Sequence, residues 1–157
     1  MKRRTIVAGL ALVSVASPAM ATDPRLARDV LRGVNAFRAG AGRAPLRLDP
    51  RLSRAATLHS LDMLRTNRLS HTGSDGSDAG LRLTRAGFAW STCRENIGAG
   101  YQDTRQALHG WIDSPAHRDN LLARTVTAAG IGFAGGPGVL PGNVPRLFWT
   151  LVLAAPR

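Results

Sequence analysis

The order of hydrophobic patterns along the chain constrains its fold more than any other feature. Apolar residues recur at helical spacing through much of residues 24–122, whereas 128–134 and 147–154 are apolar runs rich in β-forming residues. The Gly/Pro-rich segment 135–145 between these runs predicts a loop joining two antiparallel strands. Helices followed by strands, without an internal repeat or an interdomain linker, indicate one α+β domain.

Several helical segments are expected before those strands. In the helix expected over 24–38, Arg38 and the other arginines should mostly face solvent. In the helix expected over 78–86, Ser77 is the expected N-cap and Leu81 is the residue expected to face inward. A short strand is expected around 95–98. Periodic apolar residues, with Asp, Ser and Pro at several first turns, predict the helices over 24–38, 50–67, 78–86, 104–111 and 115–122.

The N-terminus has the pattern of an export signal. Basic residues 2–4 precede an apolar stretch, 5–15, and residues 19–21 form a small-x-small cleavage signal. An N-terminal membrane anchor is the alternative, because the uncharged run is just long enough to be a candidate span. The expectation is a signal peptide over 1–21 and a mature domain over 22–157 with no transmembrane segment, secreted or periplasmic.

The charge balance limits the classes of partner. The 157 residues include 21 Lys or Arg and 10 Asp or Glu, and losing the three basic residues of the leader lowers the formal charge from +11 to +8. The arginines are scattered and aromatic residues make up 5%, which argues against nucleic-acid binding. Outside the cell such a charge favours anionic envelope polymers or lipid headgroups, through an attraction that salt weakens.

Two residue types, cysteine and glutamate, each occur only once in the sequence. Cys93 is the only cysteine, so an intramolecular disulfide is impossible; a buried structural thiol is expected, with a reactive or intermolecular thiol as the alternative. Glu95 is the only glutamate, which indicates that side-chain length matters there. The alternative for Glu95 is a simple ion pair with Arg94 or another arginine.

The four histidines differ in their expected surroundings. His109 is expected on the solvent face of its helix, and His59 lies on a core stripe, where a satisfied core residue is more common than a ligand. His71 stands at the mouth of a polar loop. His117 lies at the third position of a capped helix, whose dipole favours the neutral ring that metal ligation or general-base chemistry needs.

Short motifs run in order from about Val30 to Leu153. They are Asn35-x-x-Arg38, Leu46-x-Leu48-Asp49, Ala56-x-x-His59-Ser60-x-Asp62-Met63, Ser70-His71-Thr72, Glu95-Asn96-Ile97, Trp111-x-x-Ser114-Pro115-x-His117-Arg118-x-Asn120-Leu121, Gly130-Ile131-Gly132 and Phe148-Trp149-Thr150. In this order and spacing, the chain resembles the cysteine-rich secretory protein, antigen 5 and pathogenesis-related 1 (CAP or SCP) superfamily, in its short bacterial form.

The resemblance implies an α-β-α sandwich with a central antiparallel sheet, and a cleft of histidines and acidic residues that in some members holds a divalent metal. Animal members have a second glutamate shortly after the tryptophan that matches Trp111. Here only Asp113 is available, one position earlier and one methylene shorter. His59 is a substitute contributor if its helix faces the cleft. The cleft residues carried over are His71, Glu95 and His117, with Asp113 and His59 beside them.

These residues leave several functions open. Two histidines and a carboxylate leave an open position on zinc or another divalent cation, with His71 and His117 as metal ligands and Glu95 as the candidate catalytic group. The same side chains can instead form a structural hydrogen-bonded network. Because Ser70 lacks a nucleophile-elbow pattern and no complete acid–base set is present, an exported binding module is expected rather than an enzyme. Its ligand would be a lipid, a cell-wall component or a partner protein; a divalent-metal-dependent hydrolase, for example a peptidase, is the alternative.

Overall fold

The computed structural model describes residues 23–157, so the expected signal peptide lies outside the described residues. No helix within this range is both long and apolar enough to cross a membrane. In chain order the elements are α1 (Pro24–Gly40), β1 (Arg47–Leu48), α2 (Pro50–Thr66), α3 (Ala79–Arg85), β2 (Trp90–Ala99), α4 (Thr104–Asp113), α5 (Pro115–Leu121), β3 (Ala128–Leu140) and β4 (Val144–Pro156).

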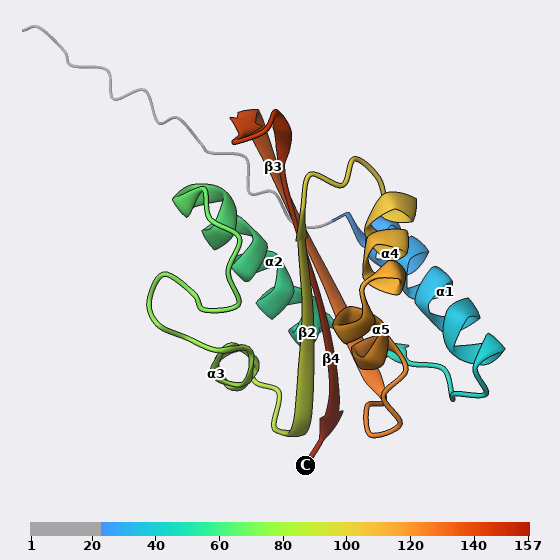
Figure 1. The fold of residues 1–157 in the computed structure, drawn as a ribbon. Helices are drawn as coiled ribbons and strands as arrows, with labels where there is room; N and C mark the ends of the chain where they lie inside the picture. Colours follow the sequence, from blue (N-terminus) through green and yellow to red (C-terminus); the bar gives the residue numbers. More distant parts are fainter. Residues whose placement is uncertain (1–22) are drawn as a thin grey trace, which may run out of the picture.

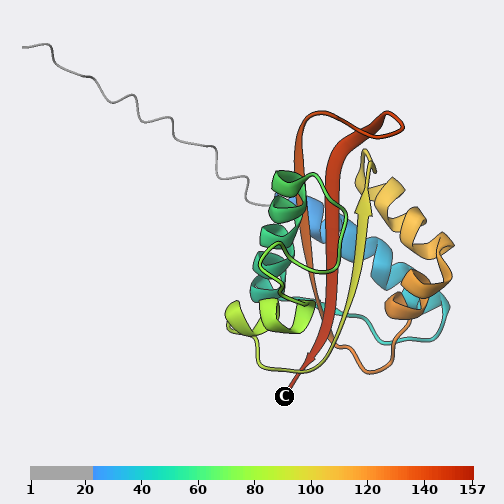
Figure 2. The same cartoon turned by 60° about the vertical axis from the view of Figure 1, so that its left-hand side comes forward.

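The strands form one sheet in the order β1-β3-β4-β2. The three long strands are antiparallel to their neighbours, and the two-residue β1 adds a short parallel pairing to β3. Figures 1 and 2 show α2 and α3 on one face of this sheet and α1, α4 and α5 on the other. The α+β class and the α-β-α sandwich expected from the sequence are therefore confirmed.

The prediction that residues 135–145 form a loop is wrong. β3 and β4 continue through most of this segment as a long ribbon, and only residues 141–143 lie between them. Gly142 and Asn143 take positive φ values of 79° and 58° there, which suits a tight turn. A register shift between Gly135 and Val139 absorbs the intervening glycines and proline as a bulge, so these residues interrupt the ladder without ending it.

Two glycines let α2 lie directly on the sheet. A Cβ atom at Gly130 would overlap the backbone at Leu52, and one at Gly132 would overlap the backbone at Ala56. Both glycines lie on β3, and α2 packs on β3 and β4 through its buried face. The Gly130-Ile131-Gly132 motif therefore has a packing role, because no larger residue fits between helix and strand.

Arg38 is the main departure from the expected helix faces. Its side chain is buried, and it donates hydrogen bonds to the carbonyl oxygens of Ala44 at 2.8 Å, Leu121 at 2.7 Å and Ala123 at 3.0 Å. Leu121 ends α5, so the guanidinium satisfies carbonyls that the helix itself leaves without partners. The expectation that Arg38 faces solvent is wrong for this reason.

The short helix α3 also differs in detail from its prediction. Asp78, not Ser77, is its N-cap, because the Asp78 carboxylate accepts a hydrogen bond from the backbone N–H of Leu81. Leu83 is the buried leucine, whereas Leu81 is exposed. This rotation of α3 turns Arg82 inward, where it becomes part of the site described below.

Candidate functional site

Strand β2 positions the central carboxylate. Successive residues of a strand point to opposite faces, so Glu95 and Asn96 diverge. Glu95 faces the α2/α3 side, and its side chain is only 5% exposed. Asn96 faces the opposite side, where its Nδ2 donates to the carbonyl oxygen of His117 at 3.0 Å and its Oδ1 accepts from Asn120 at 2.9 Å. The Glu-Asn motif thus links the two helical layers across the edge strand.

Glu95 is held by two cationic or proton-donating partners. His71 Nδ1 lies 2.9 Å from Oε1, and Arg82 Nη2 lies 2.7 Å from Oε2. Burial alone would raise the pKa of Glu95, but the hydrogen bond from His71 and the charge of Arg82 outweigh burial and lower it. The carboxylate is therefore ionised at neutral pH, and His71 Nδ1 carries the proton that it donates to Oε1.

Arg82 is the functional residue that sequence reasoning missed. Its side chain is 10% exposed, and its guanidinium also donates to the carbonyl oxygens of Ser77 at 2.8 Å and His71 at 3.1 Å. The alternative considered for Glu95, an ion pair with an arginine, is present in the structure, and the partner is Arg82. Arg94 Nη1 lies instead 3.4 Å from Asn120 Oδ1. The only signal in the sequence was that a buried carboxylate requires a cation, which does not say which arginine supplies it.

His59 lies behind the same carboxylate. The side chain is 1% exposed, and its Nε2 is 2.9 Å from the Ser70 carbonyl oxygen and 3.9 Å from Glu95 Oε1. Because a carbonyl only accepts, Nε2 must carry the proton. Burial lowers the pKa of His59, which keeps the ring neutral. His59, His71, Arg82 and Glu95 are referred to below as the Glu95 cluster.

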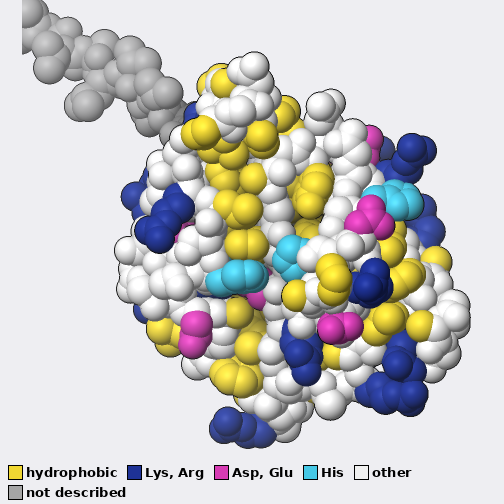
Figure 3. All heavy atoms as spheres, in the orientation of Figure 1, with side chains coloured by type: hydrophobic (Ala, Val, Ile, Leu, Met, Phe, Trp, Pro, Cys, Tyr) yellow, Lys and Arg dark blue, Asp and Glu magenta, His cyan; other side chains and the backbone are white. Residues whose placement is uncertain are grey.

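His117 approaches this cluster from the other helical layer. Burial lowers the pKa of His117 most, and the charge of His71 lowers it further. The Nδ1 atom of His117 is buried, and no described residue forms a hydrogen bond with it. Figure 3 shows two histidine side chains together near the middle of one face, with hydrophobic side chains running from them toward the tip of the β3–β4 hairpin.

Asp113 stands apart from the other candidates. It is exposed at the end of α4, and no hydrogen bond or ion pair joins it to the Glu95 cluster within residues 23–157. Its charge acts on Tyr101, whose pKa is raised by burial and then by Asp113. The structure therefore brings together His59, His71 and Glu95, places His117 nearby, and leaves Asp113 outside.

The donor set does not fit a metal ion as it is arranged. Among the described residues, no group of three or more His, Cys, Asp or Glu side chains is placed to hold one. Both oxygens of Glu95 already have partners, and the Arg82 cation would repel a divalent ion at the same carboxylate. The cluster is better described as a hydrogen-bonded network closed by an internal cation.

Cys93 is half-buried, and no other cysteine is available to it. It packs beside a hydrophobic cluster that contains Leu83 and Phe88. Burial raises the pKa of its thiol, so little thiolate is present at neutral pH. This supports the structural interpretation over the reactive one.

His59, His71 and His117 are expected to titrate on opposite sides of the ordinary histidine pKa of 6.5. His71 should be half-protonated above it, because Glu95 stabilises its charged form and raises its pKa, whereas burial should keep His59 and His117 below it. The raised pKa means that the contribution of His71 to stability is fully present below its unfolded-state pKa and is lost as pH rises through the folded-state value.

Titration of the imidazole resonances by NMR checks this prediction. In Glu95→Gln the neutral amide removes the stabilising charge, and the pKa of His71 should fall relative to the unmodified protein. A His71 pKa that does not respond to Glu95→Gln would show that the hydrogen bond seen at 2.9 Å does not govern the ring.

A sheet with helices on both faces, and a histidine-bonded glutamate on its edge strand, defines an α-β-α sandwich protein. Residues 31–152 match the model of the Cysteine-rich secretory protein family (CAP). The match covers most of the chain, so the protein belongs to the CAP family, as the sequence motifs indicated.

Bacterial relatives support this assignment. The chain is 29% identical over 106 residues to the uncharacterized protein YkwD of Bacillus subtilis (strain 168), covering 68% of this chain and 41% of that protein. It is 31% identical over 105 residues to the uncharacterized membrane protein YlbC of the same organism, covering 67% and 30%. The chain thus spans about two fifths or less of the length of these curated relatives.

Solved structures share the fold. An extracellular protein containing an SCP domain from Bacillus anthracis str. Ames superposes with a TM-score of 0.72 at 28% identity, covering 83% of this chain and 40% of that one. An outer surface protein of Borrelia burgdorferi gives a TM-score of 0.71 at 15% identity, covering 83% and 92%. The second likeness concerns the fold alone.

Proposed function

We propose that this CAP domain is an exported binding module that attaches to an anionic polymer of the cell envelope through the surface around His71. Residues 1–21 would serve as its export signal and 22–157 as the domain. The observation that carries the proposal is the state of His71: its side chain is 59% exposed, yet Nδ1 is held by a buried carboxylate. Its other ring nitrogen, Nε2, is thereby oriented to meet a ligand.

The electrostatics support an anionic ligand. Glu95 raises the pKa of His71, so the ring gains its positive charge at a higher pH than an ordinary histidine does. The mature chain would carry a formal charge of +8 and no lysine, so its positive surface consists of arginine, which binds phosphate and carboxylate groups in a bidentate manner. A charged histidine within such a surface favours anionic groups.

The relatives are consistent with an envelope location. The structurally similar Bacillus protein is described as extracellular, and the similar Borrelia protein as an outer surface protein. Binding is favoured over metal-dependent hydrolysis because both oxygens of Glu95 are occupied by His71 and Arg82. The Arg82 cation beside this carboxylate also repels a second cation there.

Co-sedimentation with isolated bacterial cell walls tests the proposal. The chain without residues 1–21 should pellet with walls that carry an anionic polymer, and retention should fall several-fold between about 50 mM and about 500 mM salt as the charges are screened. His71→Ala should weaken retention several-fold, whereas His109→Ala, a matched change of an exposed histidine on α4, should not.

Two results would contradict the proposal. Retention that stays constant in high salt would exclude an electrostatic attachment. Equal retention of the His71→Ala and His109→Ala proteins would exclude the surface around His71. Vesicles of phosphatidylglycerol and phosphatidylcholine provide the comparison. Stronger binding to these vesicles than to the walls would show that the positive surface attaches to lipid headgroups and not to a wall polymer.

A further inference from the structure

The β3–β4 hairpin extends past the rest of the domain. Figures 1 and 2 show its closed end beyond the ends of α2 and β2. Its outer part, residues 137–145, is called the hairpin tip below. Strand pairing continues through Val139 and Leu140 as far as the turn at 141–143. The hairpin tip is therefore a projecting part of the sheet itself.

Arg146 fixes the base of the hairpin to α2. Its guanidinium donates to the side-chain oxygen of Asn67 at 2.8 Å and to the carbonyl oxygens of Leu64 and Pro137, both at 2.9 Å. Asn67 is the C-cap of α2, so the hairpin leaves the body of the domain at the level of Arg146. Gly142 in the turn lies four positions before Arg146. At about 3.3 Å per residue, the hairpin tip projects by about 13 Å.

The hairpin tip carries no charge and few polar groups. Residues 137–145 include no Asp, Glu, Lys, Arg or His, although charged residues make up 20% of the chain. Three of these nine residues are prolines, which have no backbone N–H group to donate. Asn143 is the only one with a polar side chain. Removing the hairpin tip from water therefore costs little desolvation of polar groups.

Apolar side chains of the hairpin tip face water. Val139 is 56% exposed, Pro141 is exposed, and Leu140 is half-buried. Burial of these side chains in an apolar phase is favourable in proportion to the area that leaves water. A projection encloses no small molecule, and a protein partner would need a groove that matches it. The apolar layer of a membrane covers a projection without such a match.

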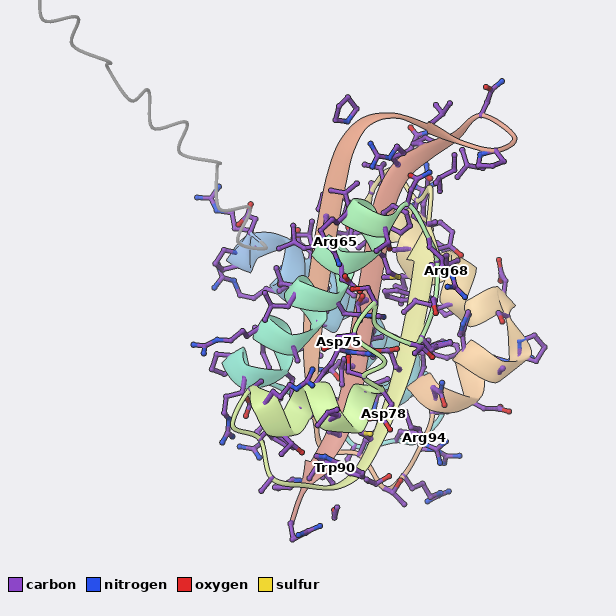
Figure 4. All side chains as sticks on the ribbon, turned by 90° about the vertical axis from the view of Figure 1, so that its left-hand side faces the viewer. Arg65, Arg68, Asp75, Asp78, Trp90 and Arg94 are labelled. Carbon is purple, nitrogen blue, oxygen red and sulfur yellow. The ribbon has the colours of Figure 1, made fainter. Side chains whose placement is uncertain are left out.

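Two arginines lie at the base of the hairpin. Arg146 is one, and Arg68, which directly follows Asn67, is the other; neither forms an ion pair among residues 23–157. Arg68 is exposed, and Figure 4 shows it below the hairpin. Guanidinium groups pair well with phosphate. An uncharged apolar tip with cations behind it complements a bilayer, where phosphates lie outside the acyl chains.

We propose that the hairpin tip inserts into the interface of an anionic phospholipid bilayer. The polar layer on each side of a bilayer is about 5–7 Å thick, so a projection of about 13 Å reaches the acyl chains while Arg146 stays at the depth of the phosphates. Few side chains enter the membrane, which makes the attachment reversible. The surface around His71 takes no part in this contact, and the inference does not rest on the proposed function.

Co-sedimentation with vesicles of phosphatidylglycerol and phosphatidylcholine tests the proposal on the chain without residues 1–21, which keeps every described residue. Val139→Asp should weaken binding about tenfold or more, because a carboxylate is costly in the apolar layer. Leu81→Asp is the matched control. It adds the same charge at a leucine that is 44% exposed, on α3 at the other end of the domain (Figure 1), and should leave binding nearly unchanged.

Val139→Trp identifies the residue that enters the membrane. Trp111 and Trp149 are buried, and Trp90 starts β2 at the end of that strand remote from the hairpin tip. The introduced indole should therefore dominate the response to lipid. Its emission should shift to shorter wavelength with vesicles and be quenched by bromine atoms on the acyl chains, and binding should strengthen several-fold. An unchanged emission, or equal binding of Val139→Asp and Leu81→Asp, would overturn the proposal.

Sedimentation equilibrium without vesicles tests a second copy of the chain as the partner. A dimer of the unmodified protein that becomes monomeric in Val139→Asp would assign the hairpin tip to self-association and refute the membrane contact. A monomer in both cases, with vesicle binding intact, supports it.

Cell-wall retention keeps this inference distinct from the proposed function. Val139→Asp should be retained on walls like the unmodified protein, and His71→Ala should bind vesicles like the unmodified protein. In Val139→Asp, the comparison of vesicles with walls then reports the surface around His71 alone. If His71→Ala lost vesicle binding as fully as Val139→Asp, the vesicles would be bound by that surface and not by the hairpin tip.

Discussion

Replacing Arg82 by methionine should lower the free energy of unfolding by about 3 kcal/mol, because breaking a buried ion pair leaves an uncompensated charge. The Glu95 side chain is 5% exposed and would lose its 2.7 Å partner. Methionine has a similar length and keeps helix propensity, so the loss of charge and hydrogen bonds dominates. Urea denaturation at neutral pH, with a constant slope, measures the change.

Arg85→Met is the matched control for this experiment. Arg85 lies on the same short helix and pairs with Asp75, but both side chains are 54% exposed. Solvent screens such a pair, so the denaturation midpoint should stay nearly unchanged. If Arg82→Met and Arg85→Met had the same small effect, the Arg82–Glu95 pair would not be the internal cation that closes the network.

Replacing Gly132 by alanine should cost about 3 kcal/mol or more. The added Cβ atom would overlap the backbone of α2 at Ala56, and a backbone cannot rotate away as a side chain can. The helix must then move off the sheet, which also opens the buried contact between Ser60 and Thr150, whose hydroxyls lie 2.8 Å apart. Thermal unfolding followed by circular dichroism measures the loss.

Gly40→Ala provides the control for a glycine without a neighbour. Gly40 ends α1, and nothing lies within 4 Å of a Cβ atom built there. Alanine should therefore leave stability unchanged or raise it slightly by restricting the unfolded chain. A Gly132→Ala protein as stable as Gly40→Ala would mean that α2 does not rest on β3 as described.

The helices could be predicted from the sequence because their signals are local. Asp49 and Pro50 start α2 as expected, and the Asp49 carboxylate accepts from the Arg51 backbone N–H at 2.8 Å. The β3–β4 ribbon could not be predicted in the same way. Glycines and prolines in 135–145 favour a loop locally, and only the pairing of the two strands across the bulge keeps them in the sheet.

The site was predictable in part. His71 and Glu95 were identified as candidates, and they form the hydrogen bond at the centre of the cluster. The order of the sequence motifs points to both residues, and Glu95 is in addition the only glutamate in the sequence. Arg82 was not identified, because its inward position depends on how α3 is rotated against β2. Asp113 was identified by its place in the chain, but the end of α4 points it away from the cluster.

The amino-acid sequence by itself determined the family, the α+β class and the limits of the helices, since these depend on motif order, periodicity and caps within a few residues. The tertiary structure alone decided the chemistry of Glu95. A buried carboxylate takes its properties from the groups that surround it, and here they come from α2, α3 and the loop after α2. Packing placed the Arg82 guanidinium beside that carboxylate, where it supplies the positive charge that a buried carboxylate requires.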